Sequence, residues 1–262
     1  MKLNIIIAFS VALLFLSCKK TVTLKLNNVP PAIVIQGEVT DAPGPYTVTI
    51  NKPVNFYADN TFPPISGATV TITDGHGVAD FLTETSPGTY STHTLVGIQG
   101  YTYTLTAEVQ GQNYTAVSTM PRNVSLDSVT FQSNSGFGKT RISAIANFQD
   151  PPNIKNYYQF FEYINGVQLT KDLFVFDDRL SDGRYINYTL YNDSSYLVSG
   201  DQLQVNMYSV DSNVYNYFYQ LNQSNSGGTF DASPANPTSN ISNGAYGYFS
   251  AHTINSVQEI VP

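Results

Sequence analysis

Side chains that could do catalytic chemistry are few in this sequence, and their spacing does not suit it. The chain has three histidines, His76, His93 and His252, and none lies in an HExxH motif or another paired spacing. It has no GxSxG motif, which in hydrolases places a nucleophilic serine on a sharp turn. We therefore predict no catalytic residues, no metal site and no cofactor, and we do not expect an enzyme.

The densest group of acidic residues is DDRLSDGR, at positions 177–184. Asp177, Asp178 and Asp182 offer the oxygen ligands that Ca²⁺ prefers. The segment lacks the alternating acidic positions of an EF-hand loop, and its two arginines would compete for the same carboxylates. We therefore favour a charged hairpin tip over a calcium site.

Aromatic and amide side chains suit binding better than catalysis. A tyrosine has a flat apolar face and a hydroxyl, and an asparagine both donates and accepts hydrogen bonds. Because the chain has no Trp, however, strand aromatics must also fill a core, and we expect most of them to be packed. The strand aromatics in question are Tyr157, Phe160, Phe161, Tyr163, Tyr185, Tyr188 and Tyr191.

The first residues predict export. Lys2 precedes an apolar run at 5–16, which is shorter than the roughly 20 residues that span a bilayer, so residues 1–17 are typical of a signal peptide. A small residue directly before Cys18, the only cysteine, resembles a bacterial lipobox. In such a site the sulfur receives a diacylglycerol and the mature chain begins at the cysteine. We predict lipidation of Cys18; the alternative is an ordinary signal peptide with an incidental cysteine.

Charge and composition exclude some classes of protein and of binding partner. Charged residues make up 12% of the chain and hydrophobic residues 42%, which excludes a disordered protein driven by charge. The formal net charge of −7 argues against a nucleic-acid partner. Residues 18–29 are basic and are predicted to form a tether between the lipid anchor and the folded part.

Residues 30–121 predict an immunoglobulin-like or transthyretin-like β-sandwich. Short runs of β-branched and aromatic residues alternate there with Gly, Pro, Asn and Asp, and turn residues at 74–77 and 110–112 favour tight hairpins. The predicted strands are 33–39, 46–51, 68–74, 78–84, 88–93, 101–109 and 113–120.

Pro121 marks a boundary, since proline cannot continue a strand ladder, and residues 122–262 predict a second, aromatic-rich β domain. One helix is expected after Asp211 or Ser212, because Val214, Tyr217, Phe218 and Leu221 recur at helical spacing. The predicted strands are 128–133, 140–150, 156–165, 172–178, 184–192, 202–210 and 245–254. The fold class is therefore mainly β, with one short helix.

Ser128 is a candidate site for modification. Asp127-Ser128-Val129 resembles the short pattern of an acidic residue, Ser or Thr and an aliphatic residue that is O-glycosylated in Bacteroidota. The alternative is that Ser128 simply begins a strand.

Three longer segments carry a resemblance to a known family. They are FQDPPNIKNYYQF (148–160), VYNYFYQLNQ (214–223) and PANPTSNISNGAYGYFSA (234–251). With these the chain resembles the DUF4249 family of Bacteroidota lipoproteins. The resemblance implies an outer-membrane lipoprotein of uncharacterised function, often encoded beside TonB-dependent receptors, and it implies no catalytic residues. Surface-exported lipoproteins of these bacteria often carry acidic residues after the lipidated cysteine, where this chain has Lys19 and Lys20. The sequence therefore does not decide between the periplasmic and the outer face of the membrane.

Three functions are compatible with this sequence. The first is a lipid-anchored binding accessory to a TonB-dependent transporter in nutrient capture, and it is the one we favour. The second is a structural or adhesion component of the envelope. The third, an extracytoplasmic glycoside hydrolase, needs two carboxylates that meet in space, and the sequence favours no pair.

Overall fold

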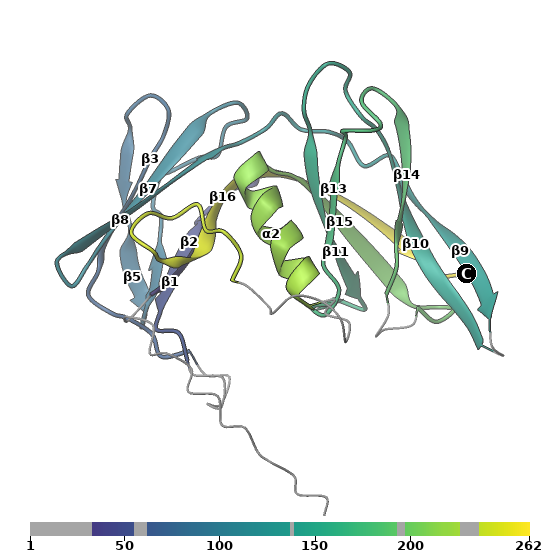
Figure 1. Cartoon of the computed structure of the whole chain (residues 1–262), viewed down its shortest axis with the longest axis horizontal. Helices are drawn as coiled ribbons and strands as arrows, with labels where there is room; N and C mark the ends of the chain where they lie inside the picture. Colours follow the sequence, from purple (N-terminus) through teal and green to yellow (C-terminus); the bar gives the residue numbers. More distant parts are fainter. Residues whose placement is uncertain (1–32, 55–61, 137–138, 193–196, 226–235) are drawn as a thin grey trace, which may run out of the picture. The chain divides into compact units, whose positions relative to one another are not determined.

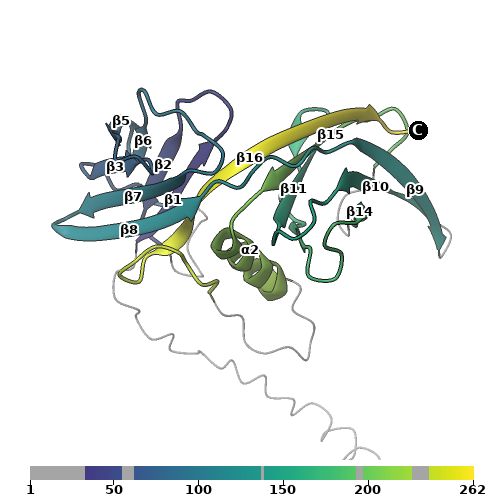
Figure 2. The ribbon, with the colours of Figure 1, turned by 90° about the horizontal axis from the view of Figure 1, so that it is seen from above.

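The structure, a computed structural model, describes residues 33–54, 62–136, 139–192, 197–225 and 236–262. In this part of the chain sixteen strands form three sheets, and α2 (Ser212–Asn225) is the one helix (Figures 1 and 2). The prediction of a mainly β fold with one short helix is confirmed.

The largest sheet has nine strands, ordered β12-β11-β15-β16-β1-β2-β6-β5, with β13 also paired to β11. Its β16 pairs in parallel with β1 on one side and antiparallel with β15 on the other. The bounds are β1 Val34–Thr40, β2 Thr47–Asn51, β5 Thr83–Ser86, β6 Thr89–Ser91, β11 Tyr157–Ile164, β12 Val167–Gln168, β13 Phe174–Asp177, β15 Gln202–Ser209 and β16 Tyr246–Ile260.

Two smaller antiparallel sheets accompany it. One has the order β4-β3-β7-β8 and the other β14-β10-β9. Their bounds are β3 Thr69–Thr73, β4 Ala79–Phe81, β7 Thr102–Val109, β8 Gln112–Thr119, β9 Ser128–Gly136, β10 Lys139–Gln149 and β14 Tyr185–Leu190. The tight turns expected at 74–77 and 110–112 join β3 to β4 and β7 to β8.

The first hydrophobic core lies between the four-stranded sheet and β1, β2 and β6. Alternate residues of β7 supply it, since Tyr103 and Leu105 are fully buried. Ile241, Phe249 and Ala251, which follow far along the chain, belong to the same core. The boundary predicted at Pro121 stays a prediction; residues beyond 240 complete the core that residues 33–120 begin.

The second core lies between the three-stranded sheet and β11, β13 and β15, and is built around Phe148, Tyr158 and Phe160. On the other face of the large sheet, α2 buries Val214, Tyr215 and Phe218. Asp211 begins the helix as predicted, because its Oδ1 accepts hydrogen bonds from the backbone N–H groups of the second and third residues after it, at 2.8 and 3.0 Å.

Several predicted strands differ from the structure in their bounds, the short β12 was not predicted, and two differences are larger. The run 78–84 is divided at Leu82, where the chain leaves β4 in one sheet and enters β5 in another. The final strand extends to Ile260 instead of ending at 254, because hydrogen bonds with β15 continue where the side chains have become polar and partly exposed. Both differences reflect pairing with distant strands, which the local pattern does not contain.

Side chains just before β16 fix the entry of that strand. The Asn240 amide donates to the Phe249 carbonyl oxygen at 2.7 Å and accepts from its N–H at 2.9 Å, so it pairs with β16 as a neighbouring backbone would. Ser242 Oγ accepts from the Thr115 N–H at 2.8 Å, which ties the segment to β8. The residues 240–251 therefore connect β8, β16 and the first core.

Gly247 permits the parallel pairing of β16 with β1. Its φ is +95°, and a Cβ there would lie 2.0 Å from the Ile35 carbonyl oxygen. Gly244 has a similar φ of +73°, but a Cβ there would meet nothing within 4 Å. The two glycines therefore share the backbone requirement and differ in the space beside them.

We expect Gly247→Ala to prevent stable folding or to lower the melting temperature far more than Gly244→Ala. In the Gly244 variant the only destabilising effect is the left-handed backbone, which costs about 1–2 kcal/mol. In the Gly247 variant the new methyl group must also push β16 away from β1. Thermal unfolding followed by circular dichroism measures both. Equal effects of the two substitutions would contradict the close approach of the two strands.

Candidate functional site

The polar segment 178–184 connects β13 to β14 and is bordered by two cavities. The prediction of a hairpin tip here is wrong: β13 pairs with β11, and β14 pairs with β10 in another sheet. Each strand buries aromatic or aliphatic side chains in the second core from its own sheet, and this holds the two apart. The connecting segment turns on its own backbone, with the Ser181 N–H donating to the Asp178 carbonyl oxygen at 2.8 Å.

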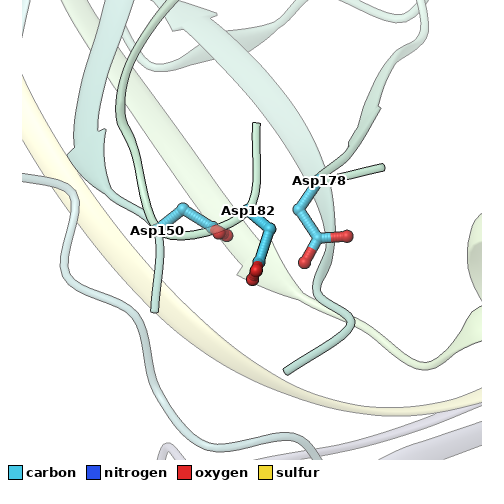
Figure 3. A group of neighbouring side chains, drawn as sticks. All are labelled: Asp150, Asp178 and Asp182. Atoms are coloured by element: carbon cyan, nitrogen blue, oxygen red, sulfur yellow. The ribbon is translucent and has the colours of Figure 1, made fainter. Parts of the chain in front are cut away.

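Three carboxylates meet beside this segment. Asp150, Asp178 and Asp182 each place an oxygen within 4.8 Å of the others, and Figure 3 shows their carboxylates pointing toward one another. Asp150 and Asp178 are 0% and 4% exposed, while Asp182 is exposed. The sequence pointed to Asp178 and Asp182, but it missed Asp150, which directly follows β10 and is brought in by the fold.

Each carboxylate accepts a hydrogen bond from the surrounding backbone. Asp150 accepts from the Gly183 N–H at 3.0 Å and from the Tyr158 hydroxyl at 2.5 Å. The Asn156 N–H donates to Asp178 at 2.8 Å, and the Asn153 N–H donates to Asp182 at 2.8 Å. The cluster thus fastens the segment 150–156 to the segment 178–184.

Like charges so close together disfavour full ionisation. Burial, followed by the charges of Asp150 and Asp182, raises the pKa of Asp178 above its ordinary value. The three carboxylates suit a hard cation such as Ca²⁺ as oxygen ligands. In each of them, however, at least one oxygen already accepts a hydrogen bond from the backbone. Protonation of Asp178 relieves the same repulsion without a metal.

Asp177 lies apart from this cluster and binds other partners. Its Oδ1 accepts from Arg179 Nε at 2.8 Å, and its Oδ2 accepts from the Tyr215 hydroxyl of α2 at 2.6 Å. Burial alone would raise the pKa of Asp177, but these hydrogen bonds, with that of Arg179 the larger, bring it below its ordinary value. The carboxylate is therefore charged, and it fixes the guanidinium of Arg179 through its Nε.

The larger of the two cavities is an open pocket of about 690 Å³ between the end of β13, the segment 178–184 and β14. Its wall combines aromatic, amide and cationic side chains. They include Phe176, Tyr185, Tyr188, Asn187, Arg179 and Arg184. The second cavity, of about 400 Å³, is lined by two acidic and two basic residues, Asp178, Asp182, Lys155 and Arg179, among others.

The three histidines lie in different parts of the fold. His76 is in the turn after β3, with its ring 4.6 Å from that of Tyr101. His93 Nδ1 lies 3.2 Å from the Asp80 carboxylate. His252 is buried in β16, and burial lowers its pKa to about 3, so it is neutral at ordinary pH. Among the described residues, the cluster of acidic and histidine side chains close enough to share a metal is that of the three aspartates.

The two modification sites predicted from the sequence, Ser128 and Cys18, stay predictions. Ser128 begins β9 and is partly buried, and its Oγ accepts from Asn147 Nδ2 at 3.3 Å. Cys18, with the predicted signal peptide 1–17 and tether 18–29, lies outside the described residues. Within the described part of the chain, no helix combines the length and the apolar character that crossing a bilayer requires.

Comparison with known families decides the membership of the chain. A family model described as "Domain of unknown function (DUF4249)" matches residues 19–258. The chain belongs to the DUF4249 family. No curated protein matches the sequence. The resemblance inferred from the three longer segments is thereby confirmed.

All three of those segments have structural roles in this DUF4249 protein. FQDPPN contains Asp150, which holds the segment 178–184, and the pattern around Asn240 and Gly247 seats β16 between β8 and β1. The helical segment forms α2 and covers the large sheet. These residues maintain the framework on which the pocket stands.

One more ionisable group is buried near this framework. Glu162 on β11 is 1% exposed, and Asn192 Nδ2 donates to its Oε2 at 2.6 Å. Its Oε1 has no hydrogen-bond partner among the described residues. Burial, with a smaller contribution from the charge of Asp172, raises the pKa of Glu162 to about 7.

The raised pKa of Glu162 predicts a pH-dependent stability. Because the folded state favours the protonated form, this contribution is complete below the unfolded pKa near 4.5 and is lost as pH rises through about 7. We expect the melting temperature to fall from pH 5 to pH 8.5, by an amount that corresponds to about 1–3 kcal/mol, and to fall less in Glu162→Gln. Glu108→Gln, at an exposed position, is the control. Parallel profiles for wild type and Glu162→Gln would contradict the assignment.

The aspartate cluster predicts opposite effects for two substitutions of Asp178. Asp178→Asn keeps an acceptor for the Asn156 N–H and removes the buried charge, so at pH 7 in a chelator we expect unchanged or higher stability. Asp178→Ala leaves that N–H unpaired and should cost about 1–3 kcal/mol. Chemical denaturation measures both. If Asp178→Asn is as damaging as Asp178→Ala under these conditions, the repulsion described here does not govern the cluster.

Proposed function

We propose that this DUF4249 protein is a non-enzymatic outer-membrane lipoprotein that serves a TonB-dependent transporter as a binding accessory in nutrient capture. The observation that carries the proposal is the open pocket of about 690 Å³ beside β14. Its volume falls in the range of small-ligand sites, and its aromatic, amide and arginine side chains are those that bind hydroxylated or charged ligands. A rigid frame of two sheets supports it, since β13 and β14 both pack on the second core.

The anchor is part of the same proposal. Lys2, the apolar run 5–16 and Cys18 support a lipidated N-terminus, and membership of a family matched from residue 19 onward agrees with a mature chain that begins at Cys18. Acyl chains hold a protein on a membrane because each buried methylene contributes about 0.8 kcal/mol. The proposal applies to either face of the outer membrane.

The finer fold and modification assignments belong here as well. We assign residues 30–121 to an immunoglobulin-like or transthyretin-like sandwich, which is supported by the core that the four-stranded sheet shares with β1, β2 and β6. We retain Ser128 as an O-glycosylation site, supported by its place at the start of an edge strand after Asp127. No nucleic-acid partner is proposed, since the chain is acidic.

The proposal is tested by affinity capture of the lipidated protein from outer membranes, followed by mass spectrometry. We expect a TonB-dependent receptor in stoichiometric amount with the wild type. Cys18→Ala is the control: it should leave the membrane fraction or fail to mature, and it should capture less receptor.

Three outcomes would count against the proposal. Capture of the lipoprotein alone would favour the structural or adhesion role. Retention of Cys18→Ala in the membrane pellet at full mature mobility would contradict the anchor. Turnover of a polysaccharide by the purified protein would contradict the non-enzymatic assignment and favour a glycoside hydrolase.

A further inference from the structure

We infer that the pocket beside β14 binds an acidic sugar, a hydroxylated ring that carries a carboxylate. The inference rests on the proposed binding function and names the ligand class of the same site. It follows from the charges, the flat faces and the hydrogen-bonding groups that the fold gathers on the pocket wall.

The segment 178–184 keeps Asp178 and Asp182 off the wall of the large pocket. These two aspartates line the smaller cavity, Arg179 lines both cavities, and Arg184 lines the large pocket. Asp177 also lies on the wall of the large pocket, but Arg179 and Tyr215 already occupy both of its oxygens. In a chain with a net charge of −7, the wall of this pocket carries two cations against one anion. Such a wall attracts an anion.

The arginines favour a carboxylate. A guanidinium presents a planar fork of N–H donors that matches the two oxygens of a carboxylate. Arg179 uses its Nε for Asp177, which fixes the side chain while 75% of it stays exposed. Among the described residues no salt bridge involves Arg184, so its fork is available to a ligand.

The remaining wall favours a ring with hydroxyl groups. Tyr185 is 51% exposed at the rim and offers a face on which a sugar ring can stack. Asn187 donates its Nδ2 to Asn147 at 2.6 Å, and its Oδ1 is an acceptor for a ligand hydroxyl.

Ser181 adds an independent observation. Its Oγ is shielded from solvent and has no hydrogen-bond partner among the described residues, and the residue lines this pocket. A buried hydroxyl without a partner is unfavourable, and rotation of this side chain toward the pocket would let it form a hydrogen bond with a polar group of the ligand.

The experiment is calorimetric titration of the full-length mature lipoprotein in detergent with trigalacturonic acid, and with its methyl ester as the uncharged counterpart. We expect binding of the acid that weakens at least about tenfold on esterification, the loss of roughly one charge-assisted hydrogen-bonded contact. Arg184→Gln should weaken binding of the acid by a similar factor and leave binding of the ester unchanged. Arg122→Gln, which removes the same charge from an exposed position outside the pocket wall, should bind as the wild type does.

Several results would overturn the inference. They are no binding of the acid, equal affinity for acid and ester, equal affinity of the Arg184→Gln and wild-type proteins for the acid, or tighter binding of glucose 6-phosphate or of an acidic peptide. Both substitutions lie on exposed side chains, and a circular dichroism melt verifies folding. If a receptor is captured but the acid does not bind, the ligand class is wrong and the accessory function stands. If the acid binds but no receptor is captured, the ligand class stands and the accessory function is wrong.

Discussion

One strand, β16, determines how the rest of this fold is arranged, because it forms backbone ladders with two other strands at once. Its first half pairs with β1 and its second half with β15. Side chains of a strand alternate between faces, so Phe249, Ala251 and Val257 all face the hydrophobic cores, while Tyr248 faces α2. A register shift by one residue would turn each of them to the wrong face. Gly247 and Asn240 are the local features that fix this register.

Buried carboxylates hold much of the surrounding chain through backbone N–H groups. Asp80 accepts from three successive residues, His93 to Leu95, and Asp211 both caps α2 and accepts from Ser118 of β8. Asp150 does the same for the segment beside the pocket. A protein with few charged residues thus uses several of its acids as hydrogen-bond acceptors for loops. Two exposed arginines, Arg179 and Arg184, line the pocket.

The local pattern of the sequence predicted which residues form strands and which helix covers them. Alternation placed Tyr103 and Leu105 in a core, and helical spacing placed Val214 and Phe218 against the sheet. Partners of each strand were not predictable, because hydrogen bonding between β13 and β11, or between β14 and β10, depends on residues distant in sequence. For the same reason the sequence named Asp178 and Asp182 but not Asp150, and it gave no sign of the pocket.

The parallel pairing of β1 with β16 also has a consequence for the order of folding. Val34 pairs with Tyr246, about 210 residues later, so the loop that must close is almost as long as the described chain. Closing a long loop lowers the chain entropy before the hydrogen bonds between β1 and β16 can form, and proteins rich in such contacts fold slowly. The edge of β1 that pairs with β16 stays open until residues 246–252 are in place, whereas its other edge pairs with the nearby β2. Until then this open edge is a template on which strands of other chains could pair.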